Sequence, residues 1–291
     1  FSLWKAKKEG EPSWPSPWGE GRPGWHIECS AMSMKYLGET LDIHSGGTDL
    51  TFPHHENEVA QAEAATGKPF VRYWIHNGYL LIDKEKMSKS LGNFLTARAA
   101  LQKYPAKAIR LFMLSAHYRS PINFSEESLN QSLGAVERLE NCWSDLEHAR
   151  KNRKTTSDGS RNEFESLFKE FEDRFVTAMD DDFNTAAALG VLFEAVKTVN
   201  TYLKETQTLE ESFLELAAEF FRKIDSVLGV LGLDAAAGEE DAEEIEALIA
   251  ERNAARKNKD FKRSDAIRDD LAARGILLED TPDGTKWKKK A

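Results

Sequence analysis

Residues 40–65 read TLDIHSGGTDLTFPHHENEVAQAEAA, and this stretch decides the fold class. Its first five residues, 40–44, are strand-like, and Gly46-Gly47-Thr48-Asp49 is typical of a turn. Pro53 is expected to open a helix that runs to about Ala65, because proline suits the first turn of a helix. Residues 79–82 form a further short apolar strand. Strands that alternate with helices predict an α/β fold with a parallel sheet.

Upstream of this stretch, residues 1–24 are rich in Trp, Pro and Gly, a composition that excludes a regular helix. The segment reads as a linker by composition, but its three tryptophans need surfaces to pack on and favour an ordered loop. Residues 27–36 are a helix candidate.

Downstream of residue 100 the pattern becomes helical. Ser125 is a suitable N-cap, and apolar side chains then recur at steps of three and four residues as far as Leu146. Further helices are expected around residues 164–175, from after Asn184 to about Leu203, and over about 211–228. A loop is expected at 154–161 and a linker at 235–241. These helices predict an antiparallel bundle followed by a small basic domain.

The composition sets limits on the class of protein. The chain has 291 residues, of which 41% are hydrophobic, so it can bury real cores and is expected to form about two domains. No apolar run approaches the roughly 20 residues of a membrane helix. The two cysteines suit a reducing cytosol, so a cytoplasmic protein is expected.

The charge is unevenly distributed. The net charge is -10, yet residues 251–291 hold 12 Lys and Arg against 8 Asp and Glu. A basic C-terminal segment on an acidic body indicates possible contact with nucleic acid, because phosphates respond to the local field. The alternative is a solvated amphipathic helix.

The stretch Lys86-Met87-Ser88-Lys89-Ser90 follows directly on the strand at 79–82. Two lysines and two serines in one loop supply positive charge and hydroxyl donors for a polyphosphate. The alternative is a solvated basic turn, but this string after a strand favours the phosphate interpretation.

A second group of residues has the donor types of a zinc site. His54 and Glu58 are four residues apart and share a helix face, and Cys29 adds a thiol. A polar helix beside a buried thiol is the alternative, and spacing alone favours it. Cys142, the other cysteine, falls inside the long predicted helix of another domain.

The residues of three stretches together resemble cysteinyl-tRNA synthetase, a class I aminoacyl-tRNA synthetase. These stretches are Gly24–Ser30, Phe52–Glu58 and Asp182–Thr185, and Lys86–Ser90 matches the second signature of the class, KMSKS. The resemblance covers almost the whole chain. The chain lacks the first signature, HIGH, and the first zinc-ligating cysteine, so it is expected to be the C-terminal portion of a longer enzyme.

The resemblance implies four parts. Residues 1–100 correspond to the second half of a Rossmann catalytic domain with the KMSKS loop, 101–124 to a connecting segment, 125–237 to a helical bundle and 238–291 to a small α+β anticodon-binding domain. The implied reaction joins L-cysteine to cysteine tRNA through cysteinyl-adenylate, with ATP and Mg²⁺. The protein is expected to be a monomer, with an N-terminal segment as a missing partner.

The resemblance also assigns residues. It makes Cys29, His54 and Glu58 three of four ligands of one Zn²⁺ that selects the substrate thiolate. It assigns ATP contacts to Lys86 and Lys89, and the adenylate site to His44, Gly46, Gly47 and Asp49. Trp25 is assigned to a wall of the amino-acid pocket. The residues assigned to anticodon contacts are Arg256, Phe261, Asp265, Asp280 and Trp287.

Two alternatives remain open at this stage. An inactive tRNA-binding fragment or paralogue fits the missing first signature. A ligase that joins cysteine to an amino-sugar would use the same zinc site and loop, but that family lacks an anticodon-binding domain.

Overall fold

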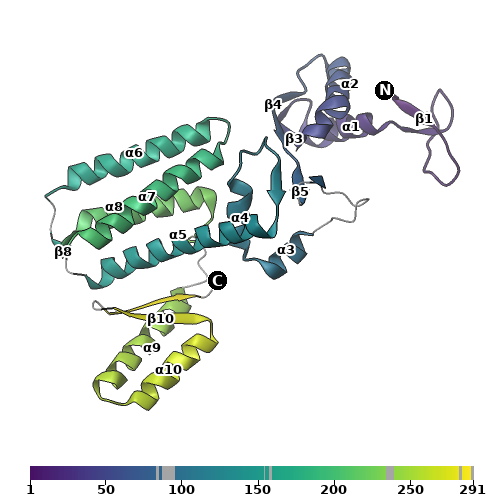
Figure 1. Cartoon of the computed structure of the whole chain (residues 1–291). Coiled ribbons are helices and arrows are strands. Elements are labelled where there is room, and N and C mark those ends of the chain that lie inside the picture. The colour runs from purple at the N-terminus through teal and green to yellow at the C-terminus, as the bar shows by residue number, and fades with distance from the viewer. Residues whose placement is uncertain are drawn as a thin grey trace. The chain divides into compact units, whose positions relative to one another are not determined.

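The computed structural model describes residues 1–82, 85–86, 96–153, 155–156, 159–233, 239–281 and 284–289 (Figure 1). They form two compact units. Residues 1–92 and 118–123 belong to the first, and residues 93–117 and 124–291 to the second. Within the described residues, no helix combines the length and the apolar character needed to cross a membrane.

The first unit is built on a β-α-β crossover. Strands β3 (Leu41–Gly47) and β4 (Val71–Asn77) pair in parallel, and α2 (Glu56–Thr66) lies between them in the chain. Leu41, Ala62 and Phe70 are buried in the core of this unit. The predicted α/β fold with a parallel sheet is therefore confirmed.

The connection between β3 and α2 differs from the predicted one. Gly46 and Gly47 do not form a turn: they complete β3 and pair with His76 and Asn77 of β4. A 3₁₀ turn at Thr48–Leu50 and one wide turn at Thr51–His55 follow, so that α2 begins at Glu56 rather than at Pro53. A glycine pair breaks an isolated strand, but hydrogen bonds to a neighbouring strand override this local preference.

The remaining elements of the first unit frame the crossover. Helix α1 (Trp25–Leu37) packs against α2, and β1 (Trp4–Ala6) pairs antiparallel with β2 (Gly21–Pro23). Strands β5 (Leu80–Ile82), β6 (Glu85–Lys86) and β7 (Ile122–Phe124) form a sheet in the order β6-β5-β7. The N-terminal segment thus contains a strand pair.

The expected packing of the N-terminal tryptophans is wrong for two of them. Trp14 and Trp18 remain 55% and 80% exposed, although Trp14 also forms a bridge with Gly21. The strand pair orders the backbone of this segment without enclosing these two rings.

The second unit begins with α3 (Ala97–Lys103) and α4 (Ala106–Leu114) and continues into a bundle. The bundle helices are α5 (Glu126–Asn152), α6 (Arg161–Asp180), α7 (Thr185–Glu205) and α8 (Glu211–Leu228) (Figure 1). The Oγ of Ser125 accepts the amide of Ser128 and caps α5, as the sequence indicates. A short parallel pair, β8 (Thr155–Thr156) with β9 (Leu209–Glu210), lies where a loop is expected.

The core of the bundle is rich in phenylalanine. Phe168 and Phe171 of α6 contact Phe220 of α8. Cys142 of α5 is buried in the same core, and burial raises the pKa of its thiol to about 12. Cys142 is therefore a core residue.

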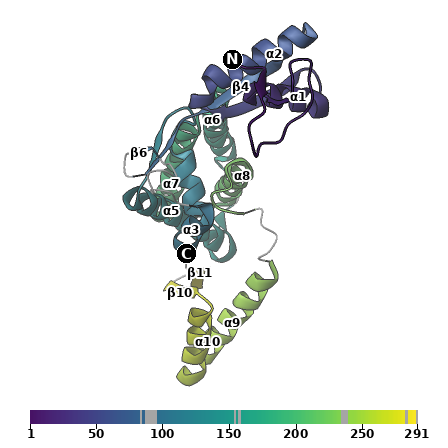
Figure 2. The ribbon, with the colours of Figure 1, turned by 90° about the vertical axis from the view of Figure 1, so that its right-hand side faces the viewer.

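A small α+β domain ends the chain. Helices α9 (Glu239–Lys257) and α10 (Phe261–Ala273) lie side by side, and β10 (Ile276–Thr281) pairs antiparallel with β11 (Gly284–Lys289) (Figures 1 and 2). Its core consists of Ile245, Ile249, Ile267, Leu271 and Ile276. The predicted α+β architecture is confirmed.

Candidate functional site

Glu58 occupies the centre of the candidate site in the first unit. Its side chain, on the first turns of α2, is fully buried. His44 of β3 approaches one carboxylate oxygen, with Nε2 at 2.6 Å from Oε2. His54, in the turn before α2, approaches the other, with Nε2 at 2.6 Å from Oε1. A buried carboxylate is thus held between two imidazoles.

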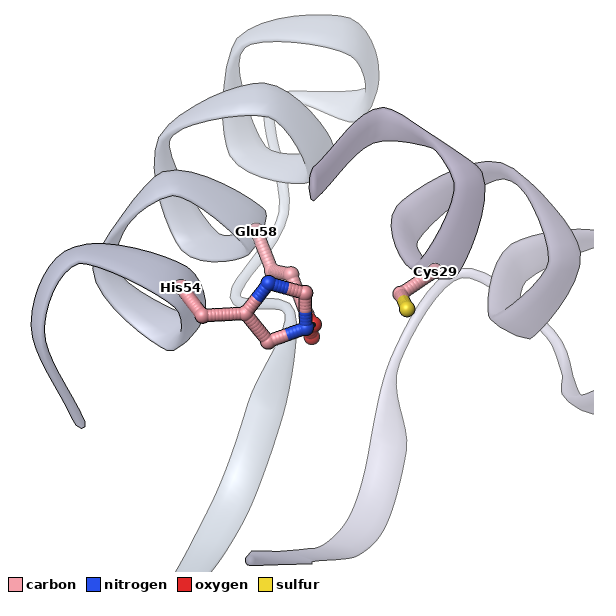
Figure 3. Close-up of side chains that lie close together, drawn as sticks. All are labelled: Cys29, His54 and Glu58. Carbon is pink, nitrogen blue, oxygen red and sulfur yellow. Dashed lines mark ion pairs between the residues drawn. The ribbon is translucent and has the colours of Figure 1, made fainter. Parts of the chain in front are cut away.

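Cys29 faces this pair from α1. Figure 3 shows its sulfur directed toward the His54 ring and the Glu58 carboxylate, and one ligand atom of each residue lies within 4.8 Å of the other two. Burial, and next the negative charge of Glu58, raise the pKa of the Cys29 thiol. A cation between these groups would compensate the charge that disfavours the thiolate.

The donor set fits a zinc ion. Oε1 of Glu58 is buried and makes no hydrogen bond with the part of the chain that the structure describes, although Nε2 of His54 lies 2.6 Å away. A buried carboxylate oxygen without a hydrogen bond is costly unless a cation satisfies it. Thiolate, imidazole and carboxylate are the ligand types that Zn²⁺ takes. His44, His55 and Glu58 form a second, overlapping group within the same distance, which lacks the thiol.

Further histidines surround the ligands. Nδ1 of His54 lies 2.8 Å from Nδ1 of His26, so both ring nitrogens of His54 face defined partners. Nδ1 of His55 lies 2.8 Å from Nε2 of His76 on β4. Burial, and next the neighbouring His44, lower the pKa of His55 to about 4, so that its ring is neutral at neutral pH. Partners of this kind fix the orientation of metal-binding imidazoles.

Two tryptophans cover the histidines. Trp25, at the start of α1, stacks on His54 with ring centroids 4.3 Å apart, and half of its surface stays exposed. Trp74 of β4 stacks on His44 at 4.7 Å. Trp25 therefore lies against a candidate zinc ligand, stacks also on His26, and is still half exposed.

The expected adenylate residues lie along the end of β3. Gly46 has no space for a side chain, because a Cβ would lie 2.8 Å from Cε1 of His55. Gly47 is the last residue of the strand, and Asp49 follows in the 3₁₀ turn. His44 is on the same strand and contacts Glu58. The structure therefore brings His44 and Gly46 to the histidine cluster.

The signature loop lies largely outside the described residues. The backbone of Lys86 is in β6, opposite Leu81 of β5, but its side chain and the whole of Lys89 are not among the residues described. The roles assigned to both lysines remain predictions.

Of the residues expected to contact the anticodon, two are exposed on α10, and others are held by contacts within the C-terminal domain. Phe261 and Asp265 are exposed on α10, and Asp265 lies 3.4 Å from Arg268. The Nε1 of Trp287 on β11 donates to Glu246 of α9. Hydrogen bonds from Arg252 hold the pKa of the Asp280 carboxyl well below its usual range, with further bonds from Thr285 and Arg256.

Residue patterns alone did not point to four members of the first site: His26, His55, Trp74 and His76. Five of the seven histidines of the chain gather here, and this concentration is visible in the sequence before residue 80. The alternation of Trp74 and His76 on β4 was a further available signal, since residues two apart on a strand share a face.

Three family models match the chain. The catalytic domain of class I (C) tRNA synthetases matches residues 1–134, a DALR domain matches 174–232, and the anticodon binding domain of cysteinyl-tRNA ligase matches 240–287.

Curated relatives match over nearly the whole chain. It is 54% identical to the cysteine–tRNA ligase of Geobacillus thermodenitrificans, over 99% of this chain and 61% of the relative. It is 53% identical to that of Geobacter metallireducens, over 100% of this chain and 63% of the relative. The chain therefore spans about three fifths of the length of the relatives it matches.

Solved structures resemble the fold, and one of them is a leucyl enzyme bound to tRNA. The LeuRS of Agrobacterium radiobacter K84, in a ternary complex with tRNA and LeuAMS, aligns with a TM-score of 0.57 at 15% identity. The alignment covers 78% of this chain and 35% of that one.

Proposed function

Because the chain belongs to the cysteinyl-tRNA synthetase family, we propose that it carries part of the ATP-dependent ligation of L-cysteine to cysteine tRNA through cysteinyl-adenylate. One observation supports this most directly: Cys29, His54 and Glu58 converge within 4.8 Å in a fold that also ends in an anticodon-type domain. A thiol-selecting metal site and an RNA-binding module are what such a ligation requires.

Cys29, His54 and Glu58 would hold a zinc ion. When bound, zinc supplies a coordination position that prefers a soft thiolate to a hydroxyl, which ordinary pocket contacts separate poorly. His26 would keep the His54 ring in its orientation, since its Nδ1 lies 2.8 Å from that of His54. The exposed face of Trp25 would form a wall of the amino-acid pocket, and its stacking on His54 at 4.3 Å supports this.

The end of β3 and the signature loop would bind the nucleotide. The end of β3 carries His44, Gly46 and Gly47, and the 3₁₀ turn that follows carries Asp49. At the two glycines the backbone can approach a ligand closely. Lys86 and Lys89 would place positive charge on the leaving pyrophosphate of ATP, with Mg²⁺. The C-terminal domain would bind tRNA through Arg256, Phe261, Asp265, Asp280 and Trp287.

The two cysteines allow a matched test of the zinc assignment. In Cys29→Ser we expect loss of zinc that survives dialysis against a weak chelator, measured by elemental mass spectrometry. In the protein extended to the length of its relatives, the same change should raise the KM for cysteine sharply in ATP–pyrophosphate exchange. Cys142→Ala, which alters the buried thiol of α5, should keep zinc and the cysteine KM. Equal zinc content in both variants would contradict the assignment.

The alternatives predict different results. An inactive tRNA-binding fragment would bind tRNA but show no cysteine-dependent ATP–pyrophosphate exchange. This would hold also for the protein extended to the length of its relatives. A cysteine:amino-sugar ligase is disfavoured by the anticodon-domain match at residues 240–287. It would consume an amino-sugar and leave tRNA unmodified. An intact mass spectrum that reveals a second polypeptide or a longer chain would favour the enzyme.

A further inference from the structure

Arg252 is a charged residue in the interior of the C-terminal domain. It lies on α9 and is 5% exposed. Its guanidinium donates two hydrogen bonds to the carboxylate of Asp280 on β10, from Nη1 to Oδ1 at 2.8 Å and from Nη2 to Oδ2 at 2.9 Å. A bidentate grip of this kind fixes both the position and the plane of a carboxylate.

Arg256 reaches the same carboxylate from one helical turn later. Its Nη1 lies 2.5 Å from Oδ2 of Asp280, and its side chain is 47% exposed. Thr285 of β11 donates to Oδ1 at 2.9 Å. Each oxygen of Asp280 thus receives two donors, about the number that a carboxylate can accept. Arg256 is the arginine of the pair with an exposed side chain, so a ligand can reach its guanidinium.

The arrangement is not the one that stability alone would favour. The Nε of Arg252 is buried and has no hydrogen-bond partner among the described residues. A buried ion pair is often no more stabilising than apolar side chains of the same volume, and an unpaired buried donor adds a cost. A role in placing the carboxylate and the second arginine accounts for the arrangement.

We propose that Arg252 is a positioning residue for RNA recognition. Its fork fixes Asp280, and Asp280 in turn holds Arg256, so that the domain presents the remaining guanidinium donors of Arg256 to a ligand. The ligand that matches these donors is the acceptor edge of an unpaired nucleobase. The inference rests on the proposed tRNA binding, which it deepens.

The test uses Arg252→Lys, because lysine keeps the charge but cannot form the planar fork. Filter binding measures Kd for cysteine tRNA and for the same tRNA with one anticodon base changed, and thermal unfolding is followed by circular dichroism. We expect the ratio of the Kd for the changed tRNA to the Kd for cysteine tRNA to fall by about tenfold. The midpoint temperature of thermal unfolding should change little. The matched control is Arg274→Lys, which alters the arginine bound to Glu244 at 2.8 Å in the same domain and should keep the ratio.

An unchanged ratio in Arg252→Lys, together with a lost ratio in Arg256→Gln, would overturn the positioning role and leave tRNA recognition standing. A wild-type protein that does not distinguish the two tRNAs would overturn both. If Arg252→Lys unfolds the domain, Asp280→Asn replaces it. Its effect on the ratio should be non-additive with Arg256→Gln, because both changes break one chain of contacts. Additive effects would count against the inference.

Discussion

Gly46 shows how one missing side chain shapes the candidate metal site. An added Cβ would lie 2.8 Å from Cε1 of His55 and 3.0 Å from Cδ1 of Leu50. His55 is buried and follows the candidate ligand His54 in the chain, with the two ring centroids 5.6 Å apart, so a shift of the His55 ring is expected to disturb His54. The glycine that the family resemblance assigns to the adenylate site therefore also has a packing role.

Gly46→Ala should lower the stability of the first unit and weaken zinc binding. Overpacking of a close contact costs about 1–3 kcal/mol. Urea unfolding and zinc competition with a chelator would measure the two effects. Gly134→Ala is the control, since a Cβ there meets nothing within 4 Å, and alanine in the α5 helix should stabilise by about 0.5–1 kcal/mol. Retained zinc affinity in Gly46→Ala would show that the His55 ring adjusts freely.

The ion pairs of Asp280 should make the stability of the C-terminal domain depend on pH. Its pKa in the folded state is depressed, chiefly by the Arg252 hydrogen bonds, from the ordinary value of 3.8. The stabilisation is thus fully present above this ordinary value and is lost as the pH falls through the folded-state pKa, because the unfolded state binds the proton first.

The measurement is amide hydrogen exchange of the β10–β11 hairpin in the whole chain between pH 5 and pH 3. Protection should exceed that of Asp280→Asn at pH 5, and the difference should narrow as the pH falls below about 4. A difference that grows toward low pH would contradict the ion-pair account.

Among the elements, α6 carries most of the aromatic packing of the bundle. Phe168 is 3% exposed and contacts Phe171, Phe213 and Phe220. We predict that residues 125–230 act as a spacer that holds the anticodon module.

Phe168→Ala should destabilise the bundle by about 3–5 kcal/mol through the cavity it leaves. Val176→Ala changes a residue of the same helix that is 49% exposed, and should cost far less. Chemical unfolding measures both. In the extended protein, ATP–pyrophosphate exchange at permissive temperature should be unchanged in Phe168→Ala. A loss of exchange with stability intact would contradict the spacer role.

The turn between α6 and α7 contains acidic residues. Asp182 and Phe183 adopt left-handed backbone conformations, and Asn184 caps α7 by accepting the amide of Ala187. Asp182 lies 3.7 Å from His117. Asp181 and Asp182 therefore lie between the end of α6 and the start of α7, which favours a structural role for them.

At the scale of the whole molecule, the boundary of the C-terminal domain matters for any truncation. Residue 251 lies inside α9, and Ile245 and Ile249 of the same helix belong to the core of the domain. A deletion from 251 would leave half a helix with an exposed apolar face. Removal of residues 239–291 deletes the whole domain instead.

In the extended protein, deletion of 239–291 should leave cysteine-dependent ATP–pyrophosphate exchange near the wild-type rate. It should also lower kcat/KM for aminoacylation of cysteine tRNA, because the lysines and arginines of residues 251–291 and the exposed ring of Phe261 are gone. The two assays on one preparation provide the comparison. Unchanged aminoacylation would refute anticodon binding by this domain.

The sequence by itself determined the class of each part of the protein. Apolar steps of three and four residues located α5–α8, because burial of one helix face requires that period. Alternating strands and helices predicted a parallel sheet, but β4, the strand that pairs with β3, was not among the predicted strands. The His54–Glu58 spacing predicted a shared face, and the structure has both side chains at one point.

Only the tertiary structure decided how the sites are completed. Gly46 and Gly47 extend β3 because β4 supplies hydrogen-bond partners, which no local pattern specifies. His26 and His76 join the cluster from elements that are distant in the chain. Asp280 contacts Arg252, 28 residues earlier in the chain, so its carboxylate is held by packing between distant segments. Local periodicity reports which face a residue occupies, but the partner across that face depends on packing between segments that are far apart in sequence.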